Sequence, residues 1–350
     1  MSEQTTRREF LKDTGLVAGA IGVLNPMQAL AEAQTRATIK YPNGGAEHCI
    51  FIWLGGGAAQ IDMWDPKRVG DPKAKKAGSA YPAIDTAIPG VQVTEHLDQC
   101  AKILDRFCLL RTMNHDTKDE HAAATNRMHT GRPVSGTIVY PSIGSIVANQ
   151  RGKVTKGMPA YVVMGYPNLT RGPGFLGAQD SYIYLIDTEA GPVGLRRPSG
   201  ISDTRQTRRE QLLSGLRSGF RQRASTDPAV KNYDSVIEEA FALGRGEFMN
   251  AFQLTNESGG LRESYGGEFG QRCLLARRLV QRGVRFIEVS FNLNFINGTG
   301  WDTHNEGQKN QHILIRQLDQ ALASLVLDLE KHKLFDKTLV VVATEFGRPA

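Results

Sequence analysis

Two hydrophobic patterns recur along this chain: short continuous apolar runs, and apolar residues spaced three to four positions apart. Short runs of mainly apolar residues predict buried strands at residues 49–54, 107–113, 160–164, 284–291 and 338–343. Apolar residues recurring every three to four positions predict helices at residues 96–107, 120–129, 142–150, 204–220, 236–252, 261–282 and 312–331. Mainly apolar strands that alternate with helices are typical of a parallel sheet covered on both faces. We therefore expect an α/β fold with a mostly parallel central sheet.

Two stretches show neither of these patterns. The Lys-, Pro- and Gly-rich region from Asp65 to about residue 90 predicts a surface loop. Residues 165–200 are rich in Gly and Pro, and we interpret them as a long loop that lines a site.

The first 31 residues have the pattern of an export signal. Arg7 and Arg8 are followed by Phe-Leu-Lys, then by a short apolar run at residues 15–24 and small residues at 29–31. The run is too short to span a bilayer, and the paired arginines favour a twin-arginine signal over a chance Arg-Arg in an amphipathic start. We expect the twin-arginine export machinery as a partner and the periplasm or cell envelope as the location. Residues 32–350 would then form the mature domain, without a transmembrane helix.

Composition adds little that is specific. The net charge is +6 and charged residues make up 22% of the chain, but the basic residues are dispersed. Arg205 to Arg223 is the densest basic stretch, and its helical spacing without interleaved aromatic residues predicts a solvated helix face rather than a nucleic-acid site. The four cysteines form no CxxC pair, so buried free thiols are the default, although Cys100 and Cys108 are close enough in sequence to pair.

Metal-capable side chains follow two successive predicted β/α units. Residues 300–304 read Gly-Trp-Asp-Thr-His, and residues 344–348 read Thr-Glu-Phe-Gly-Arg directly after the last apolar strand. Ligands of open parallel sheets bind outside the carboxyl ends of the strands. Carboxylate oxygens and imidazole nitrogens suit a divalent ion such as zinc or manganese. Asp302, His304 and Glu345 are therefore candidate metal ligands.

An ordered series of short motifs resembles a bacterial family known as domain of unknown function 1501, a relative of the alkaline phosphatases and sulfatases. The matching residues are 56–57, 61–67, 111–115, 121–123, 130–133, 140–144, 173–178, 276–280, 300–304 and 344–348. Each motif alone is weak, but together they cover nearly all of residues 45–350 in family order.

The resemblance implies a three-layer α/β/α fold of the alkaline phosphatase type. In that superfamily, acidic residues and histidines at the strand ends hold divalent metals, and a nucleophile lies at the start of a helix that ends in Thr-Gly. Family members usually continue past the Glu-Phe-Gly-Arg motif to a further Asp-His pair, which is missing before Ala350. We therefore expect this sequence to lack the C-terminal part of the domain.

The resemblance also suggests individual ligands. Asp302 and His304 resemble the superfamily's Asp/His metal pair, with capping of the next helix by Asp302 as the alternative. Glu345 falls where relatives carry Asp-His, and Phe346 replaces the histidine. Asp62, a few residues beyond the glycine turn, is a further candidate ligand.

Glu345 has an alternative role to metal binding: it is close enough to Arg348 in sequence for the two side chains to form an ion pair. Arg348 is otherwise a candidate for neutralising the charge of a substrate.

His121 occupies the position of the superfamily's nucleophile. It lies ten residues before Gly131, where relatives have Thr, Ser or Cys at a helix N-terminus whose dipole favours an anion. An imidazole there can act as nucleophile, metal ligand or general base. Asn114 and His115, on the preceding loop, are expected to face the same crevice and contact substrate.

Two functions remain open from the sequence. The first is an exported metal-dependent hydrolase acting on a small anionic substrate, a phosphate or sulfate ester. The alternative is a catalytically silent exported protein that uses the same fold to bind a partner or a glycan. Histidine at the nucleophile position, Phe346 and the missing Asp-His pair favour this alternative.

Overall fold

The computed structural model describes residues 44–348 apart from 72, 156, 224–225, 246, 292–299 and 305–309. The chain divides into two units, Met1–Gly44 and Gly45–Ala350. The predicted export signal at residues 1–31 lies outside the described residues.

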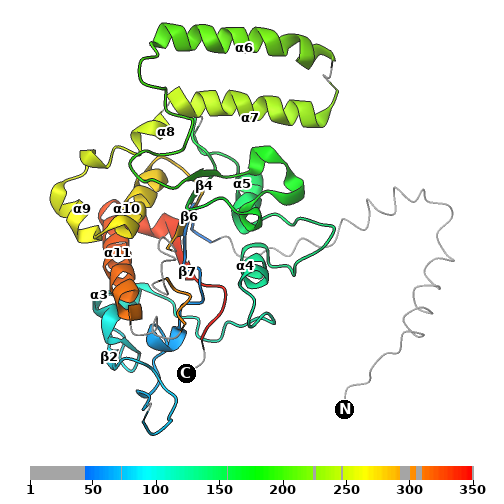
Figure 1. The fold of residues 1–350 in the computed structure, drawn as a ribbon. Coiled ribbons are helices and arrows are strands. Elements are labelled where there is room, and N and C mark those ends of the chain that lie inside the picture. Colours follow the sequence, from blue (N-terminus) through cyan, green and yellow to red (C-terminus); the bar gives the residue numbers. More distant parts are fainter. Residues whose placement is uncertain are drawn as a thin grey trace, which may run out of the picture. The chain divides into compact units, whose positions relative to one another are not determined.

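A five-stranded sheet forms the centre of the second unit (Figure 1). Its strands are β1 (His48–Trp53), β4 (Tyr161–Met164), β5 (Ile183–Leu185), β6 (Phe286–Ser290) and β7 (Thr338–Ala343). They lie in the order β5-β4-β6-β1-β7, and each pairing is parallel. The predicted parallel sheet is therefore confirmed, and the carboxyl ends of its strands meet at one edge.

Helices cover both faces of this sheet. The longer helices are α4 (His121–Thr130), α5 (Ile143–Arg151), α6 (Asp203–Arg223), α7 (Pro228–Arg245), α10 (Glu268–Gln281) and α11 (Gln311–Lys331). The shorter ones are α3 (Asp98–Lys102), α8 (Glu247–Asn250) and α9 (Gly259–Tyr265). Figure 1 shows α10 and α11 on one side of the sheet and α4 and α5 on the other, while α6 and α7 form a hairpin that projects away from the sheet.

The apolar sequence of β1 explains its central place. Ile50 and Ile52 point into the larger hydrophobic core, which also contains buried residues of α10 and α11. Phe51 and Trp53 point into a second core that includes Tyr161. Because successive side chains of a strand face opposite sides, a strand with apolar residues at successive positions can be buried on both.

The predicted strand at residues 107–113 is wrong. This segment has no regular structure, and Leu110 and Met113 are 70% and 72% exposed. A strand needs a backbone partner, and residues 107–113 pair with none of the described strands. Arg111 instead holds the segment at the surface by donating to the carbonyl oxygen of Gln92.

The two predicted loops contain short strands. An antiparallel pair, β2 (Ala83–Asp85) and β3 (Gln92–Thr94), lies around the first, and β5 lies in the second. The single helix predicted at residues 261–282 is divided into α9 and α10 at Gly266, whose φ of +81° is one that residues with side chains rarely adopt. The three strands have only three residues each, which is too short for a hydrophobic period to be recognised.

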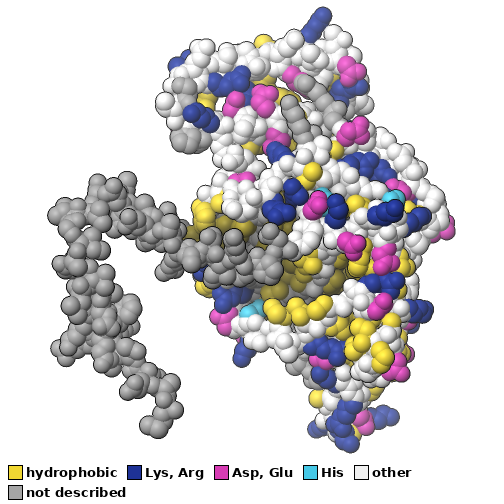
Figure 2. Space-filling model, turned by 180° about the vertical axis from the view of Figure 1, so that it is seen from behind, with side chains coloured by type: hydrophobic (Ala, Val, Ile, Leu, Met, Phe, Trp, Pro, Cys, Tyr) yellow, Lys and Arg dark blue, Asp and Glu magenta, His cyan; other side chains and the backbone are white. Residues whose placement is uncertain are grey.

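Two simpler expectations can be compared with the described residues. All four cysteines are free. Cys100 and Cys273 are buried as expected, whereas Cys49 is partly buried and Cys108 is exposed, so the expectation of burial is wrong for Cys108. In the described part of the chain, no helix combines the length and apolar character needed to cross a bilayer. Figure 2 shows hydrophobic side chains gathered on one face of the body, whereas the projecting hairpin carries many charged ones.

Candidate functional site

Glu345 lies at the carboxyl edge of the sheet, two residues after β7. Its side chain is buried, and Oε1 accepts a hydrogen bond from the backbone N–H of Gly56 at 2.7 Å. The Thr344 hydroxyl donates to the carbonyl oxygen of Leu54 at 2.9 Å and accepts from the N–H of Ala58 at 3.1 Å. These bonds join the turn after β1 to the end of β7, so the position of the Glu345 carboxylate is fixed by the sheet itself.

His121 is the first residue of α4 and lies between two carboxylates. Its Nδ1 is 2.7 Å from Oε1 of Glu345, and its Nε2 is 3.4 Å from Oδ1 of Asp302. The ring also packs against Phe346, with 4.8 Å between ring centroids. A hydrogen bond from Nδ1 to Glu345 fixes the ring and leaves Nε2 as the nitrogen that faces Asp302.

Asp302 contacts three other side chains of the site, those of His121, His304 and Arg348. Its Oδ1 lies 2.7 Å from Nε2 of His304 and also accepts a hydrogen bond from Nη2 of Arg348. Partial burial raises the pKa of Asp302, but the hydrogen bond from Arg348 and the charges of His121, His304 and Arg348 outweigh it, so the pKa lies below its usual value. The carboxylate therefore remains charged at neutral pH. Within the described residues, its side-chain contacts are with His121, His304 and Arg348, and none is with a backbone amide of α11.

The Arg348 guanidinium is directed into the protein. Besides Asp302, it donates to the carbonyl oxygens of Gly56 at 2.7 Å and Gly57 at 3.0 Å. Among the described residues its carboxylate partner is Asp302, so the alternative pairing with Glu345 is not observed. With three internal acceptors, this guanidinium stabilises the site, and its predicted contact with substrate stays a prediction.

The loop before α4 supplies a further contact. Nε2 of His115 donates to the backbone carbonyl oxygen of Glu345 at 2.5 Å, and its Nδ1 accepts from the N–H of Thr117 at 3.1 Å. Asn114 is exposed, and its amide donates to the carbonyl oxygen of Thr112. His115 thus joins the cluster through the backbone, whereas the described side-chain bond of Asn114 stays within its own loop.

Asp62 lies apart from the cluster. Its buried Oδ1 accepts a hydrogen bond from the N–H of Ala80 at 2.7 Å, and burial raises its pKa despite that bond. None of its described contacts is with Asp302 or Glu345. The structure therefore brings together His121, Asp302, His304 and Glu345, but not Asp62.

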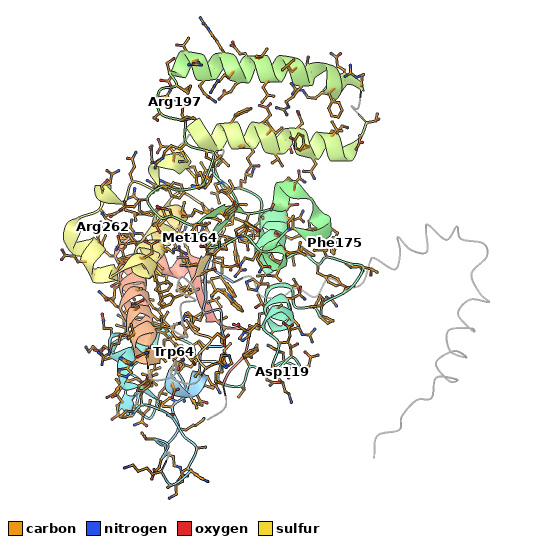
Figure 3. The ribbon with its side chains drawn as sticks, in the orientation of Figure 1. Trp64, Asp119, Met164, Phe175, Arg197 and Arg262 are labelled. Atoms are coloured by element: carbon orange, nitrogen blue, oxygen red, sulfur yellow. The ribbon has the colours of Figure 1, made fainter. Side chains whose placement is uncertain are left out.

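The N-terminus of α4 is capped by the chain itself. Both oxygens of the Glu120 carboxylate accept backbone hydrogen bonds, from Ala122 at 2.8 Å and from Ala123 at 2.5 Å. In Figure 3 the neighbouring Asp119 marks where the chain enters this helix. An anion approaching these amides has to displace Glu120.

The four clustered side chains bond to one another. Glu345, His121, Asp302 and His304 form a continuous chain of contacts, although His121 and Glu345 are 224 residues apart. Within the described residues, no three or more His, Cys, Asp or Glu side chains have the arrangement of a metal site. Chemically, the cluster offers an oriented imidazole, a charged carboxylate and the exposed imidazole of His304.

Comparison with known proteins gives one match. A family model described as "Protein of unknown function (DUF1501)" matches residues 46–350. The chain belongs to this family. No curated protein and no solved structure matches it. The match spans every residue of the cluster in this DUF1501 chain, and it assigns no activity.

One buried network in this DUF1501 protein was not predicted. Glu288, in the middle of β6, is fully buried and pairs with Arg171, and its other oxygen lies 3.4 Å from Nε2 of His129 in the last turn of α4. The sequence signal that could have revealed it is an ionisable residue inside an otherwise apolar strand.

At Gly56, the turn after β1 lies directly against the backbone of Trp301 and Asp302. Its φ is +129°, and a Cβ built on it would lie 2.3 Å from the backbone nitrogen of Asp302 and 2.7 Å from the carbonyl carbon of Trp301. No real Cβ tolerates such contacts with backbone, so only glycine lets the turn after β1 lie against residues 300–304.

We predict that Gly56→Ala costs about 2–4 kcal/mol of unfolding free energy, the sum of left-handed strain and overpacking against backbone. Gly131→Ala is the matched control, because Gly131 also has a positive φ, +68°, but nothing lies within 4 Å of its added Cβ. Urea denaturation measures both losses. Equal losses would show that the contact with Asp302 contributes nothing.

Proposed function

We propose that this protein is an exported, metal-dependent hydrolase of phosphate or sulfate esters, with His121 as general base and Asp302 and His304 as metal ligands. The chain of contacts from Glu345 through His121 and Asp302 to His304 supports this proposal. It lies at the carboxyl edge of a parallel sheet, where such folds bind their ligands.

The donor atoms fit a borderline divalent ion. A carboxylate oxygen and an imidazole nitrogen suit zinc or manganese. The Oδ1 of Asp302 and the Nε2 of His304 are 2.7 Å apart, at hydrogen-bond distance, and a bound ion would replace this direct contact. Glu345 is a less suitable ligand, because its side chain is 3% exposed against 24% for Asp302 and its Oε1 is held by both Gly56 and His121. We therefore assign Glu345 to positioning His121.

The remaining residues have separate roles in the proposed reaction. Glu345 holds the Nδ1 proton of His121, so that Nε2 can accept a proton from water. Arg348 keeps Asp302 charged and in place. A bound divalent ion would supply Lewis acidity toward an ester oxygen. Since histidine stands where relatives carry Thr, Ser or Cys, we propose attack by water, which bonds to phosphorus or sulfur as the bond to the alcohol breaks.

The metal part of the proposal is tested by binding. We expect wild-type protein to bind added Zn²⁺ or Mn²⁺ stoichiometrically in equilibrium dialysis, and the double variant Asp302→Ala/His304→Ala to bind at least about tenfold more weakly. Asp62→Ala is the matched control, because Asp62 is a carboxylate of the same unit whose contacts lie elsewhere.

Either of two outcomes contradicts this assignment. Wild-type protein that binds no stoichiometric divalent ion rules out the metal-dependent mechanism. Binding that survives the double variant but is lost in Asp62→Ala places the ion at Asp62 instead.

A second candidate function is binding without catalysis. The observation that favours it is the Glu120 carboxylate on the first amides of α4, where the anionic group of an ester would otherwise bind. Under this alternative, the protein binds a partner or glycan and releases no phosphate or sulfate from any ester. Hydrolysis of an aryl phosphate or aryl sulfate above the rate of the His121→Ala variant excludes it.

A further inference from the structure

Helix α6 exposes an apolar stripe. Leu212, Leu216 and Phe220 recur every four residues and therefore lie on one face of the helix. Their exposed fractions are 65%, 72% and 53%. No residue of α6 is buried, although the helix has 21 residues.

The face that α6 turns toward α7 is polar. Arg217 pairs with Asp234 and lies 3.3 Å from a carboxylate oxygen of Glu238, and Arg221 lies 3.1 Å from the other oxygen of Asp234. A surface helix normally buries its apolar stripe and exposes its charges. Here Arg217 and Arg221 face the neighbouring helix, and the apolar stripe faces outward.

Arginines lie at both ends of this stripe. Arg205 and Arg209 are four residues apart, and Arg209 precedes Leu212 by three positions, so both lie on the same side as the stripe. Arg223 follows Phe220 by three positions. Within the part of the chain that the structure describes, none of these three arginines forms an ion pair, so their charge is available to a partner.

We propose that this outer face of α6 binds the surface of anionic lipid membranes. The three apolar side chains can reach the acyl boundary, while the long arginine side chains at the two ends of the stripe can extend to anionic headgroups. In Figures 1 and 3, α6 is the outermost helix of the hairpin, with no element of the described chain above it. The helix is about 30 Å long, which allows it to lie flat on a bilayer.

Lipid fits this face better than a shaped protein partner. The three apolar side chains form a convex strip on a single helix, without the groove or flat area that a stable protein interface requires. The proposal does not depend on catalysis or on a metal. It extends the proposed envelope location by placing a membrane contact on the folded domain.

Vesicle cosedimentation of the full chain tests the proposal. We expect binding to phosphatidylcholine vesicles containing about one quarter phosphatidylglycerol, weaker binding to pure phosphatidylcholine, and weaker binding as salt rises through about 0.15 M. The triple variants Leu212→Ser/Leu216→Ser/Phe220→Ser and Arg205→Ser/Arg209→Ser/Arg223→Ser should each lower the partition coefficient at least tenfold. Both keep the whole chain, so any contribution of the first 31 residues is the same in all samples.

A matched control removes the same charge elsewhere. Lys73→Ser/Lys75→Ser/Lys76→Ser also loses three positive charges, from exposed positions in the loop after η1 (Gln60–Asp62), and should bind like wild type. Far-UV circular dichroism checks that each variant is folded. The substitution Phe220→Trp adds a local reporter, whose emission should shift to the blue and be quenched by brominated lipid.

Three results overturn the proposal. One is vesicle binding that the α6 variants leave unchanged. Another is an equal loss in the lysine control, which would indicate a general effect of net charge. The third is self-association of the wild type that the apolar triple variant abolishes while vesicle binding persists, which would make a second copy of the chain the occupant of this face.

Discussion

Replacing Glu288 with alanine is expected to lower the free energy of unfolding by about 3–5 kcal/mol, as removal of one partner of a buried ion pair does. Glu288 is completely buried in β6. Its carboxylate pairs with Arg171, whose side chain is also buried, and lies 3.3 Å from the hydroxyl of Tyr161. The loss is large because the substitution leaves the Arg171 guanidinium buried without its counter-charge.

The pH dependence of this stabilisation has a definite sign. Burial alone would raise the pKa of Glu288, but the charges of Arg171 and His129 outweigh it and lower the pKa from 4.5 to about 2. A carboxylate with a depressed folded-state pKa stabilises the fold above its unfolded-state pKa and loses that contribution as the pH falls through the folded-state value. The stability difference between wild type and Glu288→Ala should therefore be full above about pH 4.5 and shrink toward about pH 2.

Urea denaturation at pH 7 and at several acidic pH values measures this prediction. Asp98→Ala is the control, because Asp98 pairs with Lys102 at the surface and its removal should cost about 1 kcal/mol or less. The double variant Glu288→Leu/Arg171→Met removes both charges and should recover much of the loss. A cost for Glu288→Ala no larger than that of Asp98→Ala would show that the network does not stabilise the fold.

The Glu288 network also helps to position helix α4, which carries His121 of the candidate site. His129 lies near the end of α4, and its ring packs edge-on against Trp53 of β1 with 4.5 Å between centroids. His121 begins the same helix. Contacts of His129 with β1 and Glu288 therefore fix α4 against the sheet, and with it the distance from His121 to Glu345.

Replacing His121 with alanine is expected to lower kcat/KM for ester hydrolysis by about 10²–10⁴-fold, the usual contribution of a general base. The imidazole is oriented through the 2.7 Å bond to Glu345 and presents Nε2 toward Asp302. The ion affinity should stay within a few fold of wild type, because the proposed ligands are Asp302 and His304.

Steady-state kinetics with added Zn²⁺ or Mn²⁺ gives the activity, and equilibrium dialysis gives the affinity for the ion. His332→Ala is the control, since this half-exposed histidine follows α11 and pairs with Asp328. Unchanged hydrolysis by His121→Ala contradicts the general-base role. Loss of the ion together with the activity would instead make His121 a metal ligand.

Much of the sheet and most of the long helices were predictable from local pattern. The strands predicted at 49–54, 160–164, 284–291 and 338–343 correspond to β1, β4, β6 and β7, because the strands of a parallel sheet covered on both faces are mainly apolar. The helix predicted at residues 120–129 corresponds to α4, which ends at Gly131 with a φ of +68°. The predicted strand at residues 107–113 failed, since pairing depends on which strand occupies the neighbouring place in the sheet.

The candidate site was predictable only as a set of residues. Spacing and family resemblance indicated His121, Asp302, His304 and Glu345, and their common edge followed from the parallel sheet. The contacts among these residues were not predictable. Arg348 pairs with Asp302 rather than Glu345, and Asp62 accepts a hydrogen bond from the backbone N–H of Ala80. Such partners are chosen by distances in the folded chain, which bear no relation to separation along the sequence.

The sequence by itself determined the family, the parallel α/β architecture and the residues able to carry chemistry, because burial and helix formation follow from patterns within a few residues. Only the tertiary structure decided that His121 lies between two carboxylates and that α6 faces outward with its apolar side. Those features arise where distant segments meet, and the contacts available there depend on how the whole domain packs.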